Sequence, residues 1–419
     1  MIAQKTTLAP EPVVLLENAF QNPYDNAVAT ARTCYSSKVI HAEDVSKDEA
    51  TKIRRDAIAQ STYKAGHHTT IQHATFQFVL DKVSRQAIWS FLHSHPFYNS
   101  EQVSQRYVEM KADNFATPPL QEEHVPRYRQ AVLELTDAYH RLSGLLEPTV
   151  VKEYRRLFPV RSLEEKRWQS AIKKRCQEVA RYALPVAMHA HLYHTISGLT
   201  LHRYHRLCDQ LDVPGEQKII VQKMVEAVNR FDPEFFKFIE DPLPLEQTLE
   251  FQILKTFDES LRCCWPKAFI REFDREMGDY SSRLIDYKVN SEAVLAQSVR
   301  SVLGLPRSAM ADAEAIDWVL NPAKNPYFSE SLNLNSLSKL TRTLVHPHFT
   351  FKKKISHTAD SHIQHISRRR TGARSPGQHR GVKKDCRCYR SYVENSLHSI
   401  PLIYALSLFD ECYGSVSLA

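Results

Sequence analysis

Glycine is scarce in this chain, and that scarcity limits how the chain can bind a phosphate group. Only 10 of the 419 residues are glycine. The sequence contains neither the Gly-x-Gly-x-x-Gly turn of dinucleotide-binding folds nor a glycine-rich loop ending in Gly-Lys-Ser or Gly-Lys-Thr. These absences argue against a Rossmann dehydrogenase and a P-loop nucleotidase. If a nucleotide binds, side chains and helix ends must hold its phosphates.

The chain is too long for one ordinary core, and its middle contains a plausible boundary. A length of 419 residues favours two or three domains. Residues 231–248 include Pro233, Pro242 and Pro244 and are predicted to connect two domains. We therefore place a first domain at residues 12–230 and a second at residues 249–419.

Composition predicts a soluble cytoplasmic protein. Hydrophobic residues make up 42% and charged residues 25%, and no run of eighteen apolar residues predicts a membrane span. Residues 1–12 lack the basic start and apolar stretch of a secretory signal. The eight cysteines show no zinc-knuckle spacing, so we expect them to be reduced thiols. From the lack of a long apolar run we expect no membrane partner.

Positive charge is concentrated near the C-terminus. The net charge is +7, and residues 368–390 contain nine lysines or arginines against one acid, Asp385. Such a stretch is either a phosphate-binding surface or a solvated tail, and charge alone does not separate the two.

Local patterns predict alternating strands and helices. Phe76, Phe78 and Leu80 recur at period two and predict a strand over 74–83. Ser84 is a suitable N-cap for a helix over 85–93, which Pro96 ends before a loop through Asn99. Further helices are predicted over 44–65, 126–145, 163–182, 198–208 and 216–229, with a strand over 185–195.

A weak internal repeat links the two halves. The first copy has the strand-like Phe76-x-Phe78, followed by Ser84 and His93. The second copy has Phe349-x-Phe351, followed at similar spacing by Ser356 and His365. The repeat predicts an α+β protein of two related halves.

Three ordered motifs resemble the flavin-dependent thymidylate synthase family. They are Gly66-His67-His68-Thr69-Thr70-Ile71-Gln72-His73, Val83-Ser84-Arg85 and Ser104-Gln105-Arg106-Tyr107-Val108. The similarity spans about residues 12–229. It implies that each half is a twisted, mostly antiparallel sheet with flanking helices, and that the chains form an oligomer, with a dimer expected.

The resemblance also implies roles for individual residues. His67 and Thr69 fall where the family contacts the flavin, and Glu101 is a further predicted cofactor contact. Ser104, Gln105, Arg106 and Tyr107 fall at the nucleotide-binding segment. Gln102 falls where the family carries Glu or Gln near the uracil, so Gln102 and Arg106 are candidate catalytic residues.

The family's Arg-His-Arg triplet is altered in this chain. Counting back from Ser104 places it on Ser94-His95-Pro96, and counting forward from Arg85 places it on His93-Ser94-His95. Either alignment removes both arginines, so His93 and His95 are the remaining predicted cofactor contacts. An unperturbed histidine is mostly neutral at pH 7, which makes this positive charge conditional.

Two further arginine groups are candidates for the missing charge. Where the family places an arginine that activates the uracil, Arg203 and Arg206 are close but neither is in register without a shift, and Arg206 is the candidate catalytic residue. In the second copy, the positions that correspond to the lost triplet carry arginines, namely Arg368, Arg370 and Arg374. We expect Arg368 and Arg370 to contact the cofactor in trans, and Arg374 the nucleotide.

The resemblance implies reductive methylation of dUMP at C5. Reduced FAD would supply the hydride, methylenetetrahydrofolate the carbon and NADPH the electrons, while the protein supplies position and charge. One alternative is one-carbon transfer to another pyrimidine nucleotide. Another is a catalytically silent homologue that binds nucleotides or nucleic acid. His93, His95 and His67 or His73 lack a completing cysteine or carboxylate, so no metal site is predicted.

Overall fold

The chain folds into two compact units, Met1–Thr256 and Phe257–Ala419. The structure, a computed structural model, describes residues 8–94, 98–161, 165–209, 213–256, 265–328, 334 and 337–355. The expected connector over residues 231–248 lies within the first unit, where Phe235 is buried in the core. In the described residues, no helix is both long and apolar enough to cross a bilayer.

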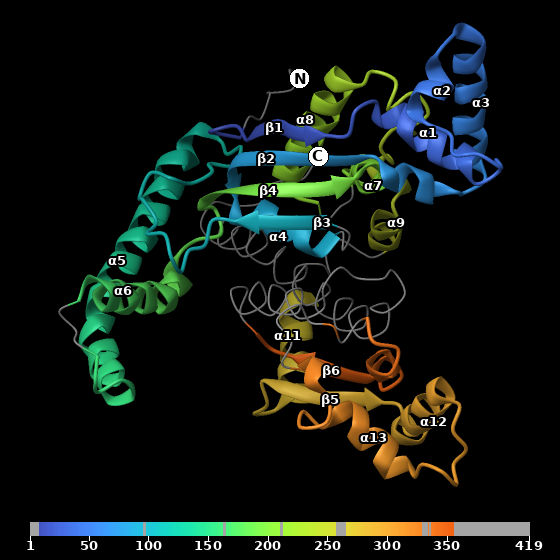
Figure 1. Cartoon of the computed structure of the whole chain (residues 1–419). Coiled ribbons are helices and arrows are strands. Elements are labelled where there is room, and N and C mark those ends of the chain that lie inside the picture. The colour runs from blue at the N-terminus through green and yellow to red at the C-terminus, as the bar shows by residue number, and fades with distance from the viewer. Residues whose placement is uncertain are drawn as a thin grey trace. The chain divides into compact units, whose positions relative to one another are not determined.

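The first unit is built on a four-stranded antiparallel sheet (Figure 1). Its strands are β1 (Val13–Ala19), β2 (Thr75–Ser84), β3 (Tyr98–Gln102) and β4 (His189–Ser197), in the order β1-β2-β4-β3. Every neighbouring pair is antiparallel. The predicted α+β class with an antiparallel sheet and flanking helices is confirmed.

One face of this sheet carries the core of the unit. Phe76, Phe78 and Leu80 of β2 are fully buried, as their period-two spacing predicts. On the opposite face Leu15 is 54% and Tyr193 is 50% exposed. Helices α1 (Pro23–Thr33), α4 (Arg85–Ser94), α7 (Gly198–Arg206) and α8 (Gly215–Phe231) contribute buried side chains to the same core.

Two long helices extend from one end of the sheet (Figure 1). They are α5 (Val125–Leu157) and α6 (Lys166–Ala180), which pack against each other. The helix predicted to end at residue 145 instead continues through Pro148 to Leu157. A proline in a helix removes one backbone hydrogen bond, and packing on a neighbouring helix offsets that loss. A small core around Tyr139 and Met188 joins α5 to the sheet.

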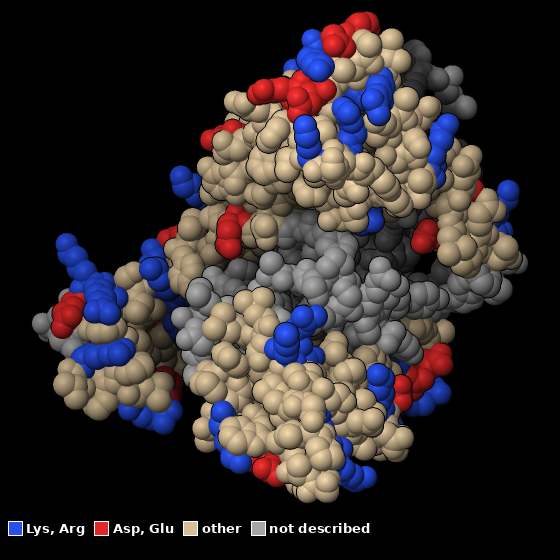
Figure 2. Space-filling view, turned by 45° about the vertical axis from the view of Figure 1, so that its right-hand side comes forward, with Lys and Arg blue, Asp and Glu red and all other residues tan. Residues whose placement is uncertain are grey.

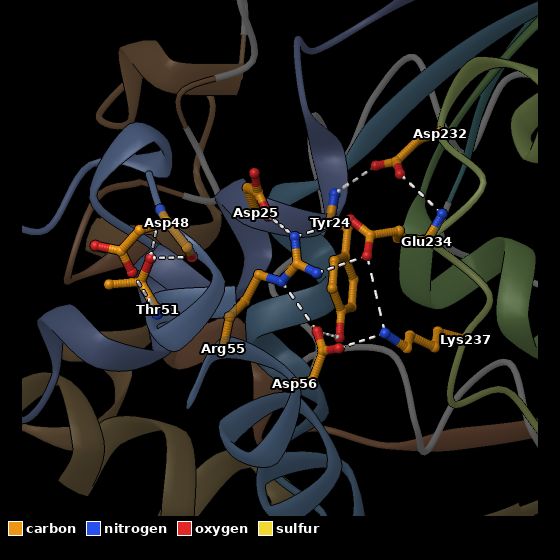
Figure 3. Close-up of polar contacts among 9 residues, drawn as sticks. All are labelled: Tyr24, Asp25, Asp48, Thr51, Arg55, Asp56, Asp232, Glu234 and Lys237. Atoms are coloured by element: carbon orange, nitrogen blue, oxygen red, sulfur yellow. Dashed lines mark hydrogen bonds and ion pairs between the residues drawn. The ribbon is translucent and has the colours of Figure 1, made fainter. Parts of the chain in front are cut away.

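The segment between β1 and β2 is helical and is tied down by a buried arginine. It contains α1, α2 (Ala42–Ser46), α3 (Glu49–Lys64) and the 3-10 helix η1 (His68–His73). Arg55 of α3 forms ion pairs with Asp25 at 2.8 Å, Asp56 at 2.9 Å and Glu234 at 2.6 Å (Figure 3). These carboxylates come from α1, α3 and the segment after α8, so one guanidinium joins three parts of the unit.

Short elements complete the first unit. They are the 3-10 helices η2 (Glu122–His124), η3 (Arg181–Ala183) and η4 (Leu245–Gln247), and the helix α9 (Leu249–Lys255).

The second unit contains a two-stranded antiparallel sheet of β5 (Ser282–Tyr287) and β6 (Phe349–Lys353). Its helices are α11 (Trp265–Met277), α12 (Ser291–Leu303) and α13 (Asp312–Leu320), with η5 (Pro326–Phe328) and η7 (Thr341–Val345). The strand predicted at Phe349 and Phe351 is confirmed. Ser356 and His365 lie outside the described residues, and the two-copy relationship stays a prediction.

Candidate functional site

The turn from β2 into α4 places Arg85. The Ser84 hydroxyl accepts a hydrogen bond from the backbone N–H of Ala87 at 3.1 Å, which confirms Ser84 as the predicted N-cap. Ser84 also donates its backbone N–H to a Glu216 carboxylate oxygen at 2.7 Å and its hydroxyl to the other oxygen. Burial raises the pKa of Glu216. These bonds fix the first residue of α4, which is Arg85.

Arg85 is a partly buried cation with only neutral acceptors. Its Nη1 donates to Oε1 of Gln102 at 2.8 Å, and its Nη2 donates to the carbonyl of Val103 at 2.7 Å. Its Nε is buried without a hydrogen-bond partner, and the described residues give Arg85 no carboxylate partner. Burial and the nearby Arg181 lower its pKa to about 10, so Arg85 remains charged at neutral pH.

Arg181 lies near Arg85, and Arg106 and Arg175 lie near Arg181 or its neighbour Glu178, with little compensating negative charge. Arg106 pairs with Glu178 at 3.3 Å, and Arg175 pairs with the same carboxylate. Arg181 donates its Nε to the backbone carbonyl of Glu178, and burial and then Arg106 lower its pKa. In the described part of the chain, two arginines thus share the Glu178 carboxylate, whereas Arg181 bonds a backbone carbonyl and Arg85 has no carboxylate partner. Such an arrangement favours a bound anion, and guanidinium groups match a phosphate geometrically.

The face shown in Figure 2 carries exposed charges of both signs, with lysine and arginine side chains interspersed with aspartate and glutamate. Because exposed mixed charges are screened by water and salt, we infer the anion site from the partly buried Arg85 group instead.

Four predicted nucleotide contacts lie beside this group. The Oε1 of Gln102 accepts from Arg85, which directs the amide NH₂ away from the guanidinium. The Ser104 hydroxyl accepts from the backbone N–H of Arg106 at 3.3 Å and keeps its own proton for donation. Tyr107 is 59% exposed, with its ring 5.3 Å from the Arg106 guanidinium carbon. Gln105 lies beside them in the same turn and is partly buried.

The predicted flavin contacts His67 and Thr69 lie at η1. Both side chains are exposed. The position of η1 is fixed by Gly198, whose N–H donates to the Ala74 carbonyl at 2.7 Å. A Cβ at Gly198 would meet the Phe235 ring at 2.6 Å and the Ile71 carbonyl at 2.9 Å, so only glycine permits this approach.

A small cavity lies behind η1. It has a volume of about 50 Å³ and is lined mainly by apolar side chains together with Tyr63 and His202. Both ring nitrogens of His202 are buried without a hydrogen-bond partner, and burial lowers its pKa to about 3. This volume holds a few water molecules and is too small for a flavin ring system. A cofactor would therefore contact η1 from outside, where His67 and Thr69 are exposed, while the Arg85 group suits its phosphates.

The two groups of predicted residues lie at different ends of the sheet in one chain. η1 precedes the first residue of β2, and Arg85 follows the last one. Nine residue steps at ~3.3 Å separate those ends by roughly 30 Å. Gln102 pairs with Leu192, which pairs with Leu80, so it lies roughly 17 Å along the strands from the η1 end. Glu101 points to the opposite face of the sheet from Gln102.

The other predicted site residues are not joined to the Arg85 group. The Nε of Arg206 pairs with Glu240 at 3.1 Å at the end of α7, and its catalytic role stays a prediction. The backbone of His93 lies in α4, but its side chain is outside the described part, as are His95, Arg368, Arg370 and Arg374.

The sequence interpretation missed the strands β1, β3 and β5 and several residues. The predicted loop through Asn99 is wrong, because Tyr98–Gln102 forms β3. Its polar sequence lacks the apolar alternation that indicates a strand, and pairing with β4 stabilises it instead. Arg85, Arg181 and Glu216 received no predicted role, although Val83-Ser84-Arg85 is part of the family resemblance.

The sequence profile of the "Thymidylate synthase complementing protein" family matches residues 15–234. A flavin-dependent thymidylate synthase of Clostridium tetani is 24% identical over 224 residues, covering 52% of this chain and 82% of the relative. One of Nitratidesulfovibrio vulgaris is 28% identical over 143 residues, covering 33% of this chain and 54% of the relative. A solved UMP/dUMP methylase of Streptomyces cacaoi, bound with 5-Br dUMP, has 20% identity and a TM-score of 0.36, covering 54% of this chain and 95% of that one.

Proposed function

The chain belongs to the thymidylate synthase complementing protein family, and we propose that it is an FAD-dependent enzyme that methylates dUMP at C5 to give dTMP. Methylenetetrahydrofolate would supply the carbon, and NADPH would reduce the flavin. FAD, when bound, supplies the hydride. The residues of this chain hold the nucleotide, orient the uracil and place positive charge near it.

The arginine group around Arg85 is the observation that carries the proposal. A partly buried guanidinium with neutral partners and a buried, unpaired Nε is costly by itself and gains from an incoming anion. Arg85 and Arg106 would bind the nucleotide phosphate, and Ser104 would donate its hydroxyl. The amide NH₂ of Gln102 is directed away from Arg85 and would donate to a uracil carbonyl.

We further propose that a second copy of the chain completes the site. His67 and Thr69 lie at the opposite end of β2 from Arg85, so one chain does not bring the proposed flavin and nucleotide contacts together. An oligomer that sets η1 of one chain beside the Arg85 group of another would unite them. Arg368, Arg370 and Arg374 remain proposed contacts from the second half of the chain.

The first experiment is an absorbance titration of the purified full-length protein with FAD and then dUMP. A bound-flavin spectrum that changes on dUMP addition would support one shared pocket. Release of tritium from dUMP labelled at C5, dependent on methylenetetrahydrofolate and NADPH, would then establish the reaction. A protein that binds no FAD under these conditions would overturn the enzyme proposal.

Mixing two inactive variants tests the shared site. His67→Ala and Arg106→Ala should each lose tritium release as separate proteins. After the two are mixed and allowed to exchange subunits, a shared site restores activity at about a quarter of the sites of a dimer. Mixed subunits with no recovered activity, shown by mass spectrometry to have exchanged, would assign both contacts to one chain.

A further inference from the structure

A histidine lies inside the apolar core beneath β3. His194 of β4 is fully buried, and its ring packs against Phe91 and Tyr204 with ring centroids 5.2 Å and 5.9 Å away. Its Nδ1 lies 2.6 Å from the Ser100 hydroxyl oxygen, and its Nε2 lies 3.3 Å from the Tyr204 hydroxyl. A buried polar ring is costly unless it is hydrogen bonded, and the hydroxyls of Ser100 and Tyr204 offset that cost. The three side chains form a continuous row of hydrogen bonds.

The chain of hydrogen bonds leads toward the candidate nucleotide site. Ser100 and Gln102 are two residues apart on β3, so their side chains lie on the same face about 7 Å apart. Gln102 is the residue held by Arg85. Ser100 is partly exposed, whereas His194 is buried, and β3 is an edge strand of the sheet. Of the three hydrogen-bonded side chains, Ser100 is therefore the one that a ligand can reach.

The histidine tautomer decides what Ser100 can offer to a ligand. If Nδ1 carries the proton, it donates to Ser100, and the serine hydroxyl is left to donate outward. If Nε2 carries the proton, Ser100 donates to Nδ1 and presents only an acceptor outward. Both arrangements keep the imidazole neutral and hydrogen bonded. Moving one proton within the core therefore inverts the polarity of a group at the site.

We propose that Ser100 contacts the pyrimidine edge of the nucleotide and that His194 is a positioning residue that sets its polarity. With a uracil carbonyl, Ser100 donates and His194 carries its proton on Nδ1. With a cytosine amine, Ser100 accepts and the proton moves to Nε2. The site would then admit both a uracil and a cytosine nucleotide. This inference rests on the proposed nucleotide function of the Arg85 group.

Binding measurements give the first test. Ser100→Ala should weaken dUMP and dCMP binding by about threefold to tenfold, the worth of one neutral hydrogen bond. Asn99→Ala is the matched control, since Asn99 is its exposed neighbour on the opposite face. Equal affinities in the wild type, Ser100→Ala and Asn99→Ala would overturn the role of Ser100.

Nitrogen-15 NMR of the histidine rings gives a readout that a structural role would not change. The His194 signals are assigned by their loss in His194→Gln or, if that variant does not fold, by their shift in Ser100→Ala. We expect dUMP to shift the tautomer balance toward Nδ1–H and dCMP toward Nε2–H. An unchanged balance with both nucleotides bound overturns this inference alone. A wild-type protein that binds neither nucleotide overturns the proposed function as well.

Discussion

Two arginines of the first unit, the buried Arg55 and the partly buried Arg85, differ in what surrounds them. Burial alone would lower the pKa of Arg55, but hydrogen bonds with Glu234, Asp25 and Asp56 outweigh it, and the pKa is raised (Figure 3). The pKa of Arg85 is lowered to about 10 by burial and by Arg181. Arg55 already has its anions within the chain, whereas Arg85 has none among the described residues. The direction of the shift therefore separates an arginine that holds the fold from one suited to a ligand.

The largest expected effect is the loss of the Arg55 ion pairs. Arg55→Met should lower the free energy of unfolding by about 3–5 kcal/mol, because removing the buried cation leaves Asp25 and the more exposed Asp56 and Glu234 without it. Chemical denaturation of the isolated variant measures this. Nucleotide affinity of the molecules that remain folded should stay within about twofold, because Arg55 has no proposed ligand contact.

Arg54 offers a matched control for that change. It precedes Arg55 on α3 and is exposed. Arg54→Met should change the free energy of unfolding by less than about 0.5 kcal/mol, as is usual for surface substitutions. If Arg54→Met and Arg55→Met lowered the free energy of unfolding by similar amounts, the structural role assigned to Arg55 would be wrong.

Arg85→Met should give the opposite pattern. We expect dUMP affinity to fall by about 10- to 150-fold, the worth of a charge-assisted hydrogen bond of about 1.5–3 kcal/mol. Stability should change by less than about 1 kcal/mol, because removing a partly buried charge offsets the loss of two hydrogen bonds. Isothermal titration and denaturation on the same preparation test both parts.

Arg175→Met is the control for the Arg85 variant. Arg175 belongs to the same group, but it is 66% exposed and already paired with Glu178. Its loss should weaken dUMP binding by only a fewfold. If Arg85→Met instead unfolds the protein as severely as Arg55→Met, the contrast between the two arginines fails.

Local sequence patterns predicted most of the elements but not the contrast between the arginines. The alternation of Phe76, Phe78 and Leu80 reports burial on one face, and Ser84 reports a helix start, because both signals act over a few residues. The ion pairs of Arg55 reach 30 and 179 residues along the chain, so no local pattern distinguishes Arg55 from Arg85. β3 was missed for the same reason, since pairing with β4 stabilises it.

The candidate site was predicted in part. Gln102, Ser104 and Arg106 were identified through the family motif, and the structure brings them to one place. The separation of His67 from that place depends on the direction of β2, which a motif does not encode. The partner of Ser84, Glu216, lies 132 residues away and carries no sequence signal of its own.

A smaller loss of stability is expected when a substitution at Gly198 crowds Phe235, close to the Arg55 ion pairs. A methyl group on Gly198 would overlap the ring of Phe235, the residue that follows Glu234. Gly198→Ala should lower the free energy of unfolding by about 1–3 kcal/mol, the usual cost of overpacking. Because the Arg85 end of β2 is remote from this contact, dUMP affinity should fall less than in Arg85→Met.

Gly144 supplies the reference for the alanine substitution. It lies inside α5, and no atom lies within 4 Å of the position that an alanine methyl group would take there. Gly144→Ala should stabilise the protein by about 0.5–1 kcal/mol, since alanine favours the helix. If Gly198→Ala also raised the free energy of unfolding, as Gly144→Ala should, the structure around Gly198 would have made room for the methyl group without cost.

His202 extends the comparison to a buried group that is neutral at pH 7. Its ring packs against Phe235 and Phe236, with centroids 5.2 Å and 5.5 Å away, and its pKa is lowered from 6.5 to about 3 by burial. Because the unfolded chain takes up a proton more readily, the stabilising contribution is present above pH 6.5 and is lost as the pH falls toward 3. Between pH 6.5 and 5.5 the loss should be about 1 kcal/mol.

His202→Phe should remove that part of the pH dependence, and the adjacent cavity leaves room for the slightly larger ring. Replacing the exposed His73 by Asn should leave the wild-type slope in place. Denaturation curves at pH 6.5 and 5.5 for the three proteins measure the difference. An unchanged slope in His202→Phe would mean that the ring gains a partner for its proton on acidification. His202 would then resemble Arg55, whose charge is matched within the fold, rather than Arg85.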